Sequence, residues 1–355
     1  MQALQLRSSP AQTPSRTLRA PLDVIIVGAT GAVGRELVTC MERRHFPVAS
    51  LRLYASQRSA GQTLPFRGEP LTVEPVSEDS FAGADLVFFA SSAEVSRRFA
   101  PLAVQAGAVV IDNSSAFRMD QDTPLVVPEA NGDSLQLHQG LIANPNCCAA
   151  IVAVVLAPLN AHAPLRRVIA ATYQAASGAG AEAMDELWQS TAAYLHGRPY
   201  RPQVLAHPYA FNLFSHDSPV DPASGANEEE IKVVLELRKL LGAPDLRVGV
   251  TCVRVPVLRA HSIALTLEFE RPVAPETALA VLERAPGVRI VNDAGANRFP
   301  MPSEAAGQDA VLAGRVRTDP SDPSGCSLSL FIAGDQLLKG AALNAVQIAE
   351  ALLAG

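Results

Sequence analysis

Short apolar runs alternate with amphipathic stretches through the first part of the chain. The runs are continuous and rich in β-branched residues, a pattern typical of strands that are covered on both faces; they occupy residues 24–27, 51–54, 86–89 and 109–111. Between them, residues 35–44 and 94–105 have the apolar spacing of helices. This alternation predicts a doubly wound parallel sheet with helices on both faces.

After Asn146 the pattern changes to longer segments with mixed apolar and polar faces. Strands are expected at residues 167–173, 247–257 and 262–268, with helices at residues 181–194 and 228–241. These elements predict a mixed, largely antiparallel sheet with helices on one face, which is an α+β second domain. Residues 341–353 form a strong helix by propensity, and we expect it to pack back on the first domain.

The length of 355 residues favours two domains. We expect residues 23–146 with 336–355 to form a nucleotide-binding domain, and residues 147–335 to form the second domain. Residues 1–22 contain no Asp or Glu and show no periodicity, so they predict a disordered tail, with an organelle transit peptide as the alternative.

Composition excludes several classes of protein. Hydrophobic residues make up 48% of the chain and charged residues only 18%, which excludes a natively disordered chain. The longest uncharged apolar run, residues 149–159, is shorter than the roughly 20 residues that a membrane helix needs. A net charge of -6 without a Lys/Arg block argues against nucleic acid and acidic lipid as partners. We expect a cytoplasmic protein that binds small molecules or other subunits.

A glycine-rich turn, Gly28-Ala29-Thr30-Gly31-Ala32-Val33-Gly34, joins the first strand to the first helix. Its glycines permit a close backbone approach, and the helix N-terminus offers free N–H groups to a pyrophosphate. A plain strand-to-helix turn is the alternative. This turn supports a Rossmann-like N-terminal domain.

The second strand is followed by Ser56-Gln57-Arg58-Ser59, with no acid to accept from a ribose 2′-hydroxyl. Arg58 and Ser59 suit a 2′-phosphate, so this loop favours NADP over NAD. A solvated loop arginine is the alternative.

Five cysteines are an odd number, too sparse for a disulfide framework and without the spacing of a zinc site, so no metal is expected. Cys147 follows Asn144-Pro145-Asn146 and directly precedes a helical apolar stretch. A thiol at a helix N-terminus has a lowered pKa, which makes Cys147 a candidate nucleophile. A buried structural cysteine is the alternative.

Several polar side chains stand where chemistry is plausible. Arg254 lies on an otherwise apolar strand face and therefore requires a desolvated partner, such as a ligand carboxylate. His261 follows at the end of this segment, where a base can reach a reacting atom. Glu229 and Lys232 lie one helical turn apart, which in isolation is typical of a surface ion pair. Arg118 follows a strand and can hold a phosphate or cap a loop.

Taken together and in order, these segments resemble the aspartate-semialdehyde dehydrogenase family over essentially all of residues 24–353. The shared motifs are GATGAVG at 28–34, NSSAFR at 113–118, PNC at 145–147, TYQAASGAG at 172–180, EEIK at 229–232, RVPVLRAHS at 254–262 and LLKGAA at 337–342. Cys148 departs from the Ser or Thr common in the family, and Gly334-Asp335-Gln336 varies a segment that often reads Ser-Asp-Asn.

The resemblance implies a role for each matched residue. The catalytic residues would be Cys147 as the acyl-accepting nucleophile, His261 as the acid/base and Gln174 as the residue that orients the substrate. Arg254 would hold the substrate α-carboxylate, Glu229 the ammonium, and a phosphate site would comprise Arg118, Asn146 and Lys232. The cofactor NADP would contact Gly28, Thr30, Gly31, Ala32, Val33, Arg58, Ser59, Ser177, Gly178 and Gln336.

The implied activity is the reductive dephosphorylation of L-aspartyl 4-phosphate to L-aspartate 4-semialdehyde through a cysteine thioester, by a homodimer or homotetramer. The first domain would then bind NADP, and the second would carry catalysis and dimerisation. A non-catalytic paralogue is one alternative. Another is N-acetyl-glutamyl-phosphate reductase, although its acetylated substrate has no ammonium to pair with Glu229. Cys148 would be either a neutral substitution or a partner for an oxidised Cys147.

Overall fold

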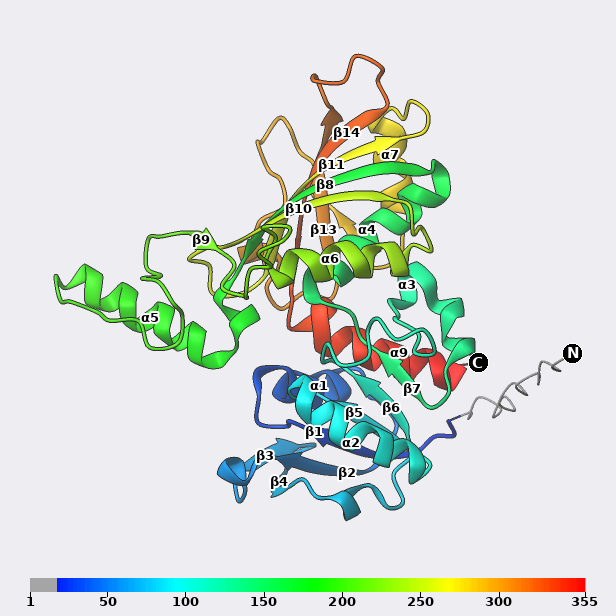
Figure 1. The fold of residues 1–355 in the computed structure, drawn as a ribbon, viewed down its shortest axis with the longest axis vertical. Helices are drawn as coiled ribbons and strands as arrows, with labels where there is room; N and C mark the ends of the chain where they lie inside the picture. Colours follow the sequence, from blue (N-terminus) through cyan, green and yellow to red (C-terminus); the bar gives the residue numbers. More distant parts are fainter. Residues whose placement is uncertain (1–17, 355) are drawn as a thin grey trace, which may run out of the picture.

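The computed structural model describes residues 18–354. Its core consists of two seven-stranded sheets, one from each half of the chain, with helices between and beside them (Figure 1). None of the described helices is long and apolar enough to cross a membrane.

The N-terminal sheet has the strand order β3-β4-β2-β1-β5-β6-β7. Its strands are β1 (Leu22–Val27), β2 (Val48–Ala55), β3 (Thr63–Phe66), β4 (Glu69–Pro75), β5 (Leu86–Phe89), β6 (Val109–Asp112) and β7 (Leu141–Ala143). All neighbours pair in parallel except β3 and β4, an antiparallel hairpin at the edge that the apolar runs did not predict. The helices α1 (Ala32–Arg43) and α2 (Ala93–Gln105) pack into separate apolar clusters of this domain. The doubly wound N-terminal fold is therefore confirmed.

The C-terminal sheet has the order β12-β13-β14-β11-β8-β10-β9. Its strands are β8 (Leu165–Gln174), β9 (Phe214–Ser215), β10 (Arg247–Arg254), β11 (His261–Phe269), β12 (Val288–Ile290), β13 (Val311–Thr318) and β14 (Ser327–Gly334). Only the pairs β8–β10 and β12–β13 are parallel, so the expectation of a mixed, largely antiparallel sheet is confirmed.

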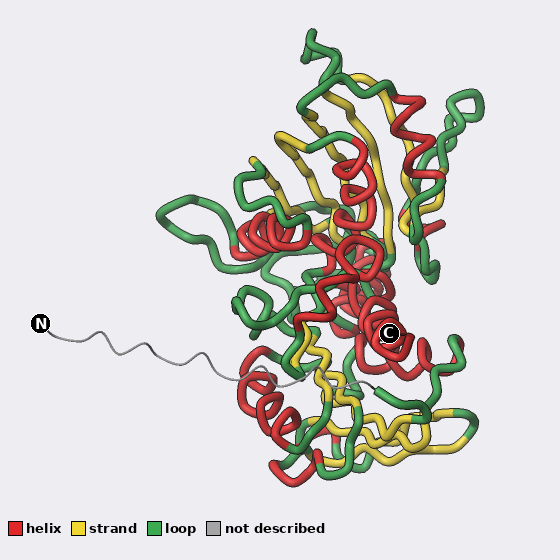
Figure 2. The backbone as a smooth tube through the Cα atoms, turned by 90° about the vertical axis from the view of Figure 1, so that its right-hand side faces the viewer, coloured by secondary structure: helices red, strands yellow, loops and turns green. Residues whose placement is uncertain are grey.

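Helices cover one face of the C-terminal sheet, as the tube view shows (Figure 2). They include α4 (Cys147–His162), α6 (Glu228–Leu240) and α7 (Pro275–Glu283), whose apolar residues share one cluster with the sheet. Residues 148–156 of α4 are all buried, as expected for a helix that is apolar on every side. Shorter helices are α3 (Pro128–Asn131) and α8 (Pro302–Ala305), while α5 (Ala181–Leu195) extends away from the sheet (Figure 1).

The chain ends in α9 (Leu343–Ala354), which packs against α1 and into the N-terminal apolar cluster, as expected. A π-helical turn, Leu338–Ala342, precedes α9. At the N-terminal end, the disordered tail expected over residues 1–22 extends too far. Leu18 is buried in the N-terminal cluster, and β1 begins at Leu22. The rest of that expectation, and of the transit-peptide alternative, lies outside the described residues.

Candidate active site

A cavity of about 470 Å³ lies where the two halves of the chain meet. Its lining combines backbone from the N-terminal domain with charged side chains from the C-terminal domain. The predicted residues that line it are Gly31, Ala32, Val33, Arg118, Asn146, Cys147, Gln174, Ser177, Gly178, Glu229, Lys232, Arg254 and Gln336.

Strand register explains why residues so far apart in sequence meet here. Gln174 and Arg254 are paired at the carboxyl ends of the parallel strands β8 and β10. His261 begins the antiparallel strand β11 at the same edge, opposite Gly334, the last residue of β14. Gln336 follows two residues later, so one edge of the sheet carries all four polar side chains. The strand expected at 247–257 ends at Arg254, which leaves His261 at the start of the next strand.

Cys147 is the first residue of α4, at the N-terminal end of this buried helix. The side chain of Asn146 caps this helix, because its Oδ1 accepts hydrogen bonds from the N–H groups of Cys148 at 2.9 Å and Ala149 at 3.2 Å. The neighbouring Cys148 thiol and His261 lower the pKa of Cys147 well below its ordinary value, although burial opposes them. The pKa of Cys148 is raised by the adjacent thiol and by burial. The half-buried Cys147 is thus the thiolate of the pair.

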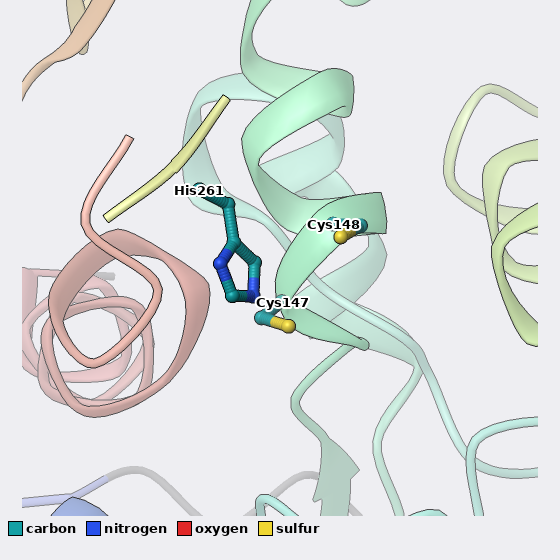
Figure 3. A group of neighbouring side chains, drawn as sticks. All are labelled: Cys147, Cys148 and His261. Carbon is teal, nitrogen blue, oxygen red and sulfur yellow. The ribbon is translucent and has the colours of Figure 1, made fainter. Parts of the chain in front are cut away.

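His261 is fully buried, and its imidazole faces Cys147 in the first turn of α4 (Figure 3). The backbone N–H of Ala175 donates to Nδ1 at 2.9 Å, while Nε2 has no hydrogen-bond partner among the described residues. Gly178 packs against this ring, because a Cβ there would lie 2.9 Å from Cε1 of His261 and 3.1 Å from Nη1 of Arg254. Only glycine leaves both side chains in place.

Ligand atoms of Cys147, Cys148 and His261 lie within 4.8 Å of one another, close enough to suggest a metal site. A metal-bound histidine almost always donates its other ring N–H to an acceptor. Here the other ring nitrogen, Nδ1, accepts from Ala175 instead. The donor set therefore does not fit a metal ion.

Glu229 forms the centre of a buried hydrogen-bond network. Its Oε1 accepts from the side-chain amides of Asn146 at 2.8 Å and Gln174 at 3.0 Å. Burial alone would raise the pKa of Glu229, but nearby His216 and these two amides outweigh burial and hold it below its ordinary value. Burial also lowers the pKa of His216, so at neutral pH the amides are the main support of the carboxylate. The cavity therefore contains a fixed negative charge.

The ion-pair interpretation of Glu229 and Lys232 is wrong. Lys232 instead pairs with the exposed Glu228 at 3.2 Å, and Glu229 turns into the protein. The pattern that distinguishes the buried face is the spacing of Glu229 and Glu236, which lie two helical turns apart on α6 and are both buried.

Glu236 was missed by the sequence reasoning, yet it anchors the wall of the cavity. Its carboxylate accepts from Arg118 Nη1 at 3.1 Å and from the backbone N–H of Asn146. Arg118 also donates to the carbonyl oxygens of Asn113 at 2.7 Å and Asn144 at 2.9 Å. Arg118 thus joins the loops that carry Asn113 and Asn144 while it also lines the cavity. Capping a loop and holding a phosphate, the two roles expected for it, are therefore compatible.

Arg254 has an internal partner that the sequence reasoning also missed. Its Nε donates to Oδ1 of Asp217 at 2.9 Å, and only 5% of the arginine side chain is exposed. Asp217 follows the short strand β9, which pairs with the end of β10. The desolvated carboxylate that Arg254 requires is therefore supplied by the chain, and the cavity-facing part of the guanidinium remains for a ligand.

The opposite wall comes from the glycine-rich turn. The N-cap residue of α1 is Gly31, which has no side chain to cap the helix, and the first turn contains no acidic residue. The backbone N–H groups at the start of α1 are thus available to a ligand, and Gly31, Ala32 and Val33 face the cavity. A Cβ on Gly28 would lie 2.2 Å from the carbonyl oxygen of Ala90, which explains the glycine there. This wall fits a dinucleotide pyrophosphate.

The remaining predicted cofactor residues form two groups. Thr30 and Ser59 share a hydrogen bond of 3.2 Å beyond the cavity itself, and neighbouring Arg58 is exposed and forms no ion pair among the described residues. Gln336 donates to the Ser177 hydroxyl and accepts from the backbone N–H of Ala260 at 2.9 Å. Gly28, Thr30, Arg58 and Ser59 thus lie outside the central cavity, on the side of the second strand.

Comparison with known proteins agrees with this architecture. Residues 23–138 match the family model "Semialdehyde dehydrogenase, NAD binding domain", and residues 156–339 match "Semialdehyde dehydrogenase, dimerisation domain". An aspartate-semialdehyde dehydrogenase of Synechocystis sp. is 51% identical over 94% of this chain and 98% of the relative. The corresponding protein of Bacillus subtilis is 42% identical over 93% of this chain and 97% of its own.

Among solved structures, aspartate semialdehyde dehydrogenase II of Vibrio cholerae, described as complexed with ASA, superimposes with a TM-score of 0.90. It is 39% identical and covers 94% of this chain and 98% of its own. The two-sheet fold, the nucleotide-type turn and the thiol-bearing cavity define an NAD(P)-binding dehydrogenase with a dimerisation domain. The chain belongs to the aspartate-semialdehyde dehydrogenase family, as its motifs indicated.

Proposed function

We propose that this enzyme uses NADPH to reduce L-aspartyl 4-phosphate to L-aspartate 4-semialdehyde, with release of NADP and phosphate, through a thioester on Cys147. The observation that carries the proposal is the position of Cys147 at the N-terminus of α4, in a cavity that also presents two buried arginines and one buried carboxylate. A substrate with an α-carboxylate, an ammonium and a phosphoryl group needs this mixture of charges.

The nucleophile is the Cys147 thiolate, whose pKa is lowered at this position. Its attack on the acyl phosphate forms a carbon–sulfur bond, and the carbon–oxygen bond to phosphate breaks with its electron pair. The backbone N–H of Cys147, which the Asn146 cap does not use, stabilises the developing oxyanion, a contribution typically of about 3–4 kcal/mol. Bound NADP(H) supplies the hydride chemistry on the thioester.

Substrate orientation falls to the charged wall of the C-terminal domain. Arg254, held by Asp217, binds the α-carboxylate, while Glu229 accepts from the ammonium. Gln174 donates to Glu229 and lines the same cavity as the thiol, so it orients the reacting carbon. Arg118 and Lys232 add positive charge where phosphate leaves, and the side chain of Asn146 supports that site by capping α4.

The preference for NADP rests on Arg58 and Ser59. Arg58 is exposed and has no acidic partner among the described residues, so a 2′-phosphate meets an uncompensated positive charge. Thr30 of the glycine-rich turn donates to the Ser59 hydroxyl, which supports contact of both hydroxyls with the adenosine part of the cofactor.

We further propose a homodimer or homotetramer, with residues 147–335 as the catalytic and dimerisation domain. Residues 23–146 with 336–355 form the NADP-binding domain. The uncovered face of the C-terminal sheet exposes Ile169 and Tyr173, which supports association through that face. All five cysteines are free, as is usual in a reducing compartment, which supports a cytoplasmic location.

The test is an assay of NADP reduction with L-aspartate 4-semialdehyde, with and without inorganic phosphate. We expect turnover that requires phosphate and is faster with NADP than with NAD. Absence of turnover under reducing conditions would contradict the proposed activity, and turnover without phosphate would contradict the acyl-transfer step.

A further inference from the structure

Ala260, the residue directly before His261, has an unusual backbone conformation. Its φ is +74°, in the left-handed region that residues other than glycine rarely adopt. Six non-glycine residues have a positive φ in the part of the chain that the structure describes, and only Ala260 among them is buried, with 1% of its surface exposed. Such conformations are strained and persist only where surrounding contacts hold them.

The preceding residue, Arg259, forms two short ion pairs. Its Nε donates to Oδ2 of Asp335 and its Nη1 donates to Oε1 of Glu36, each at 2.6 Å. Asp335 follows β14, is fully buried, and is fixed in turn by the backbone N–H groups of Gly307 at 2.6 Å and Leu337 at 3.0 Å. Glu36 lies on α1, the helix whose N-terminus faces the cavity. Arg259 is thus attached both to the segment after β14 and to α1.

A buried glutamine holds the next backbone group. The N–H of Ala260 donates to Oε1 of Gln336 at 2.9 Å, and the amide of Gln336 donates to the Ser177 hydroxyl. With His261 fixed in β11, a rotation of φ at Ala260 would carry this N–H and Arg259 away from their partners. The ion pairs and the hydrogen bond therefore oppose the return of Ala260 to an ordinary negative φ.

The conformation of Ala260 decides where the ring of His261 lies. His261 is the first residue of β11 and is paired with Gly334. Because φ at Ala260 sets the angle at which the chain enters this strand, an ordinary value with Arg259 held in place would swing His261 out of register. With the observed value, the imidazole faces Cys147 (Figure 3).

We propose that Arg259 is a positioning residue for the reaction. Through its two ion pairs it holds Ala260 in the left-handed conformation, and this conformation aims His261 at Cys147. Arg259 does not line the cavity, so it acts through its neighbours. The inference deepens the proposed function and rests on it, because the arrangement serves turnover at Cys147.

The thiol of Cys147 reports the position of the ring without any turnover. The Cys148 thiol and His261 lower the pKa of Cys147, while burial opposes them. A ring that moves away would therefore raise this pKa and slow alkylation of the thiol at neutral pH. The pH dependence of iodoacetamide labelling measures the apparent pKa, and peptide mass spectrometry separates Cys147 from the partly exposed Cys326.

Arg259→Met removes both ion pairs and keeps an unbranched side chain. We expect kcat to fall about 30-fold, KM for L-aspartate 4-semialdehyde to stay within about twofold, and the apparent pKa of Cys147 to rise by about 1. Because this variant leaves the buried Asp335 without its cation, Glu36→Gln is the milder second variant. It breaks one ion pair and should lower kcat about threefold to fivefold. Glu36→Gln decides the test if Arg259→Met does not fold.

The double variant Arg259→Met with Ala260→Gly tests the left-handed conformation itself. Glycine adopts a positive φ without strain, so the double variant should recover about fivefold in kcat over Arg259→Met and lower the pKa of Cys147 again. Arg259→Met with His45→Gly is the matched control, because His45 also has a positive φ, 52°, but is exposed directly after α1. This control should recover no kcat.

Equal kcat values for Arg259→Met and its double variant with Ala260→Gly would overturn the inference, as would an equal recovery in the His45→Gly control. A role for Arg259 only in docking α1 predicts a raised KM for NADP with an unchanged pKa of Cys147, and that result would also overturn it. Wild-type enzyme without turnover would refute the proposed function, while the pKa of Cys147 in the variants would still decide whether Arg259 positions the ring.

Discussion

The two walls of the cavity are built in opposite ways. On the C-terminal wall the polar side chains are already bonded to one another: Glu229 to Asn146 and Gln174, and Arg254 to Asp217. On the N-terminal wall the turn before α1 offers uncapped backbone N–H groups, and Arg58 is exposed without an ion-pair partner among the described residues. The C-terminal wall, here called the substrate wall, is thus organised before a ligand binds. The N-terminal wall, here called the cofactor wall, has free hydrogen-bond donors and a free positive charge that bound phosphate groups would satisfy.

This difference predicts where substitutions have large effects. A change on the substrate wall breaks a network that is buried and shared, so it affects several side chains at once. A change on the cofactor wall removes one contact to an otherwise solvated group, so its cost is small and specific to the ligand.

The largest expected effect is that of Cys147→Ser. Removal of the thiolate should lower kcat by at least about 10⁴-fold, because the covalent step is lost. The matched control is Cys148→Ser, which should keep kcat within about threefold, since the serine hydroxyl is similar in size to the buried thiol and can still donate to Cys147. Steady-state kinetics of the purified variants measures both. A larger loss of kcat in Cys148→Ser than in Cys147→Ser would show that Cys148, and not Cys147, is the nucleophile.

Glu229→Gln should come next, with kcat/KM about 100-fold lower. The substitution removes the charge that accepts from Asn146, Gln174 and the substrate, and a hydrogen bond to a charged group contributes about 1.5–3 kcal/mol. Glu228→Gln is the control, because its carboxylate forms only an exposed pair with Lys232. Similar kcat/KM values for the two variants would show that Glu229 does not bind the substrate.

Asp217→Asn should raise KM for L-aspartate 4-semialdehyde about tenfold and leave kcat within about twofold. The variant keeps the size of the side chain but weakens the bond that holds Arg254 in place. Asp221→Asn provides the control, since Asp221 is only partly buried and its side chain bonds only within its own turn. An unchanged KM in Asp217→Asn would mean that Arg254 is positioned without its help.

The smallest effect belongs to the cofactor wall. Arg58→Ala should weaken NADP binding about fivefold to tenfold, roughly 1 kcal/mol, and leave NAD binding unchanged. Arg97→Ala, which removes an exposed arginine on α2, is the control. Dissociation constants from fluorescence titration with both cofactors measure the difference. Equal losses for NADP and NAD would refute contact with the 2′-phosphate.

Local patterns predicted the elements that are buried on both sides. β5 was predicted at its observed bounds, and α4 followed from its apolar run, because full burial leaves an uninterrupted apolar signal. The edge hairpin of β3 and β4 was missed, since seven of its eleven residues are exposed and prolines interrupt it. Strands β12, β13 and β14 were likewise not predicted, although β14 is buried along most of its length.

The candidate site was predicted where motifs carry it and missed where tertiary contacts do. Cys147 and Arg254 were found from a helix start and a strand face, and both line the cavity. Asp217 and Glu236 belong to no such motif, because their roles depend on which arginine the fold brings to them. Each of these ion pairs joins residues more than thirty positions apart in the sequence. Which residues meet over such separations depends on strand register, which a single sequence does not specify.

The central claim is that the reaction passes through a thioester on Cys147. The most direct measurement mixes enzyme with L-aspartate 4-semialdehyde and NADP in the absence of phosphate, then maps the modified peptide by mass spectrometry. We predict a burst of NADPH close to one per active site, an aspartyl adduct on Cys147, and its release when phosphate is added. A burst without an adduct, or an adduct on Cys148, would contradict the account.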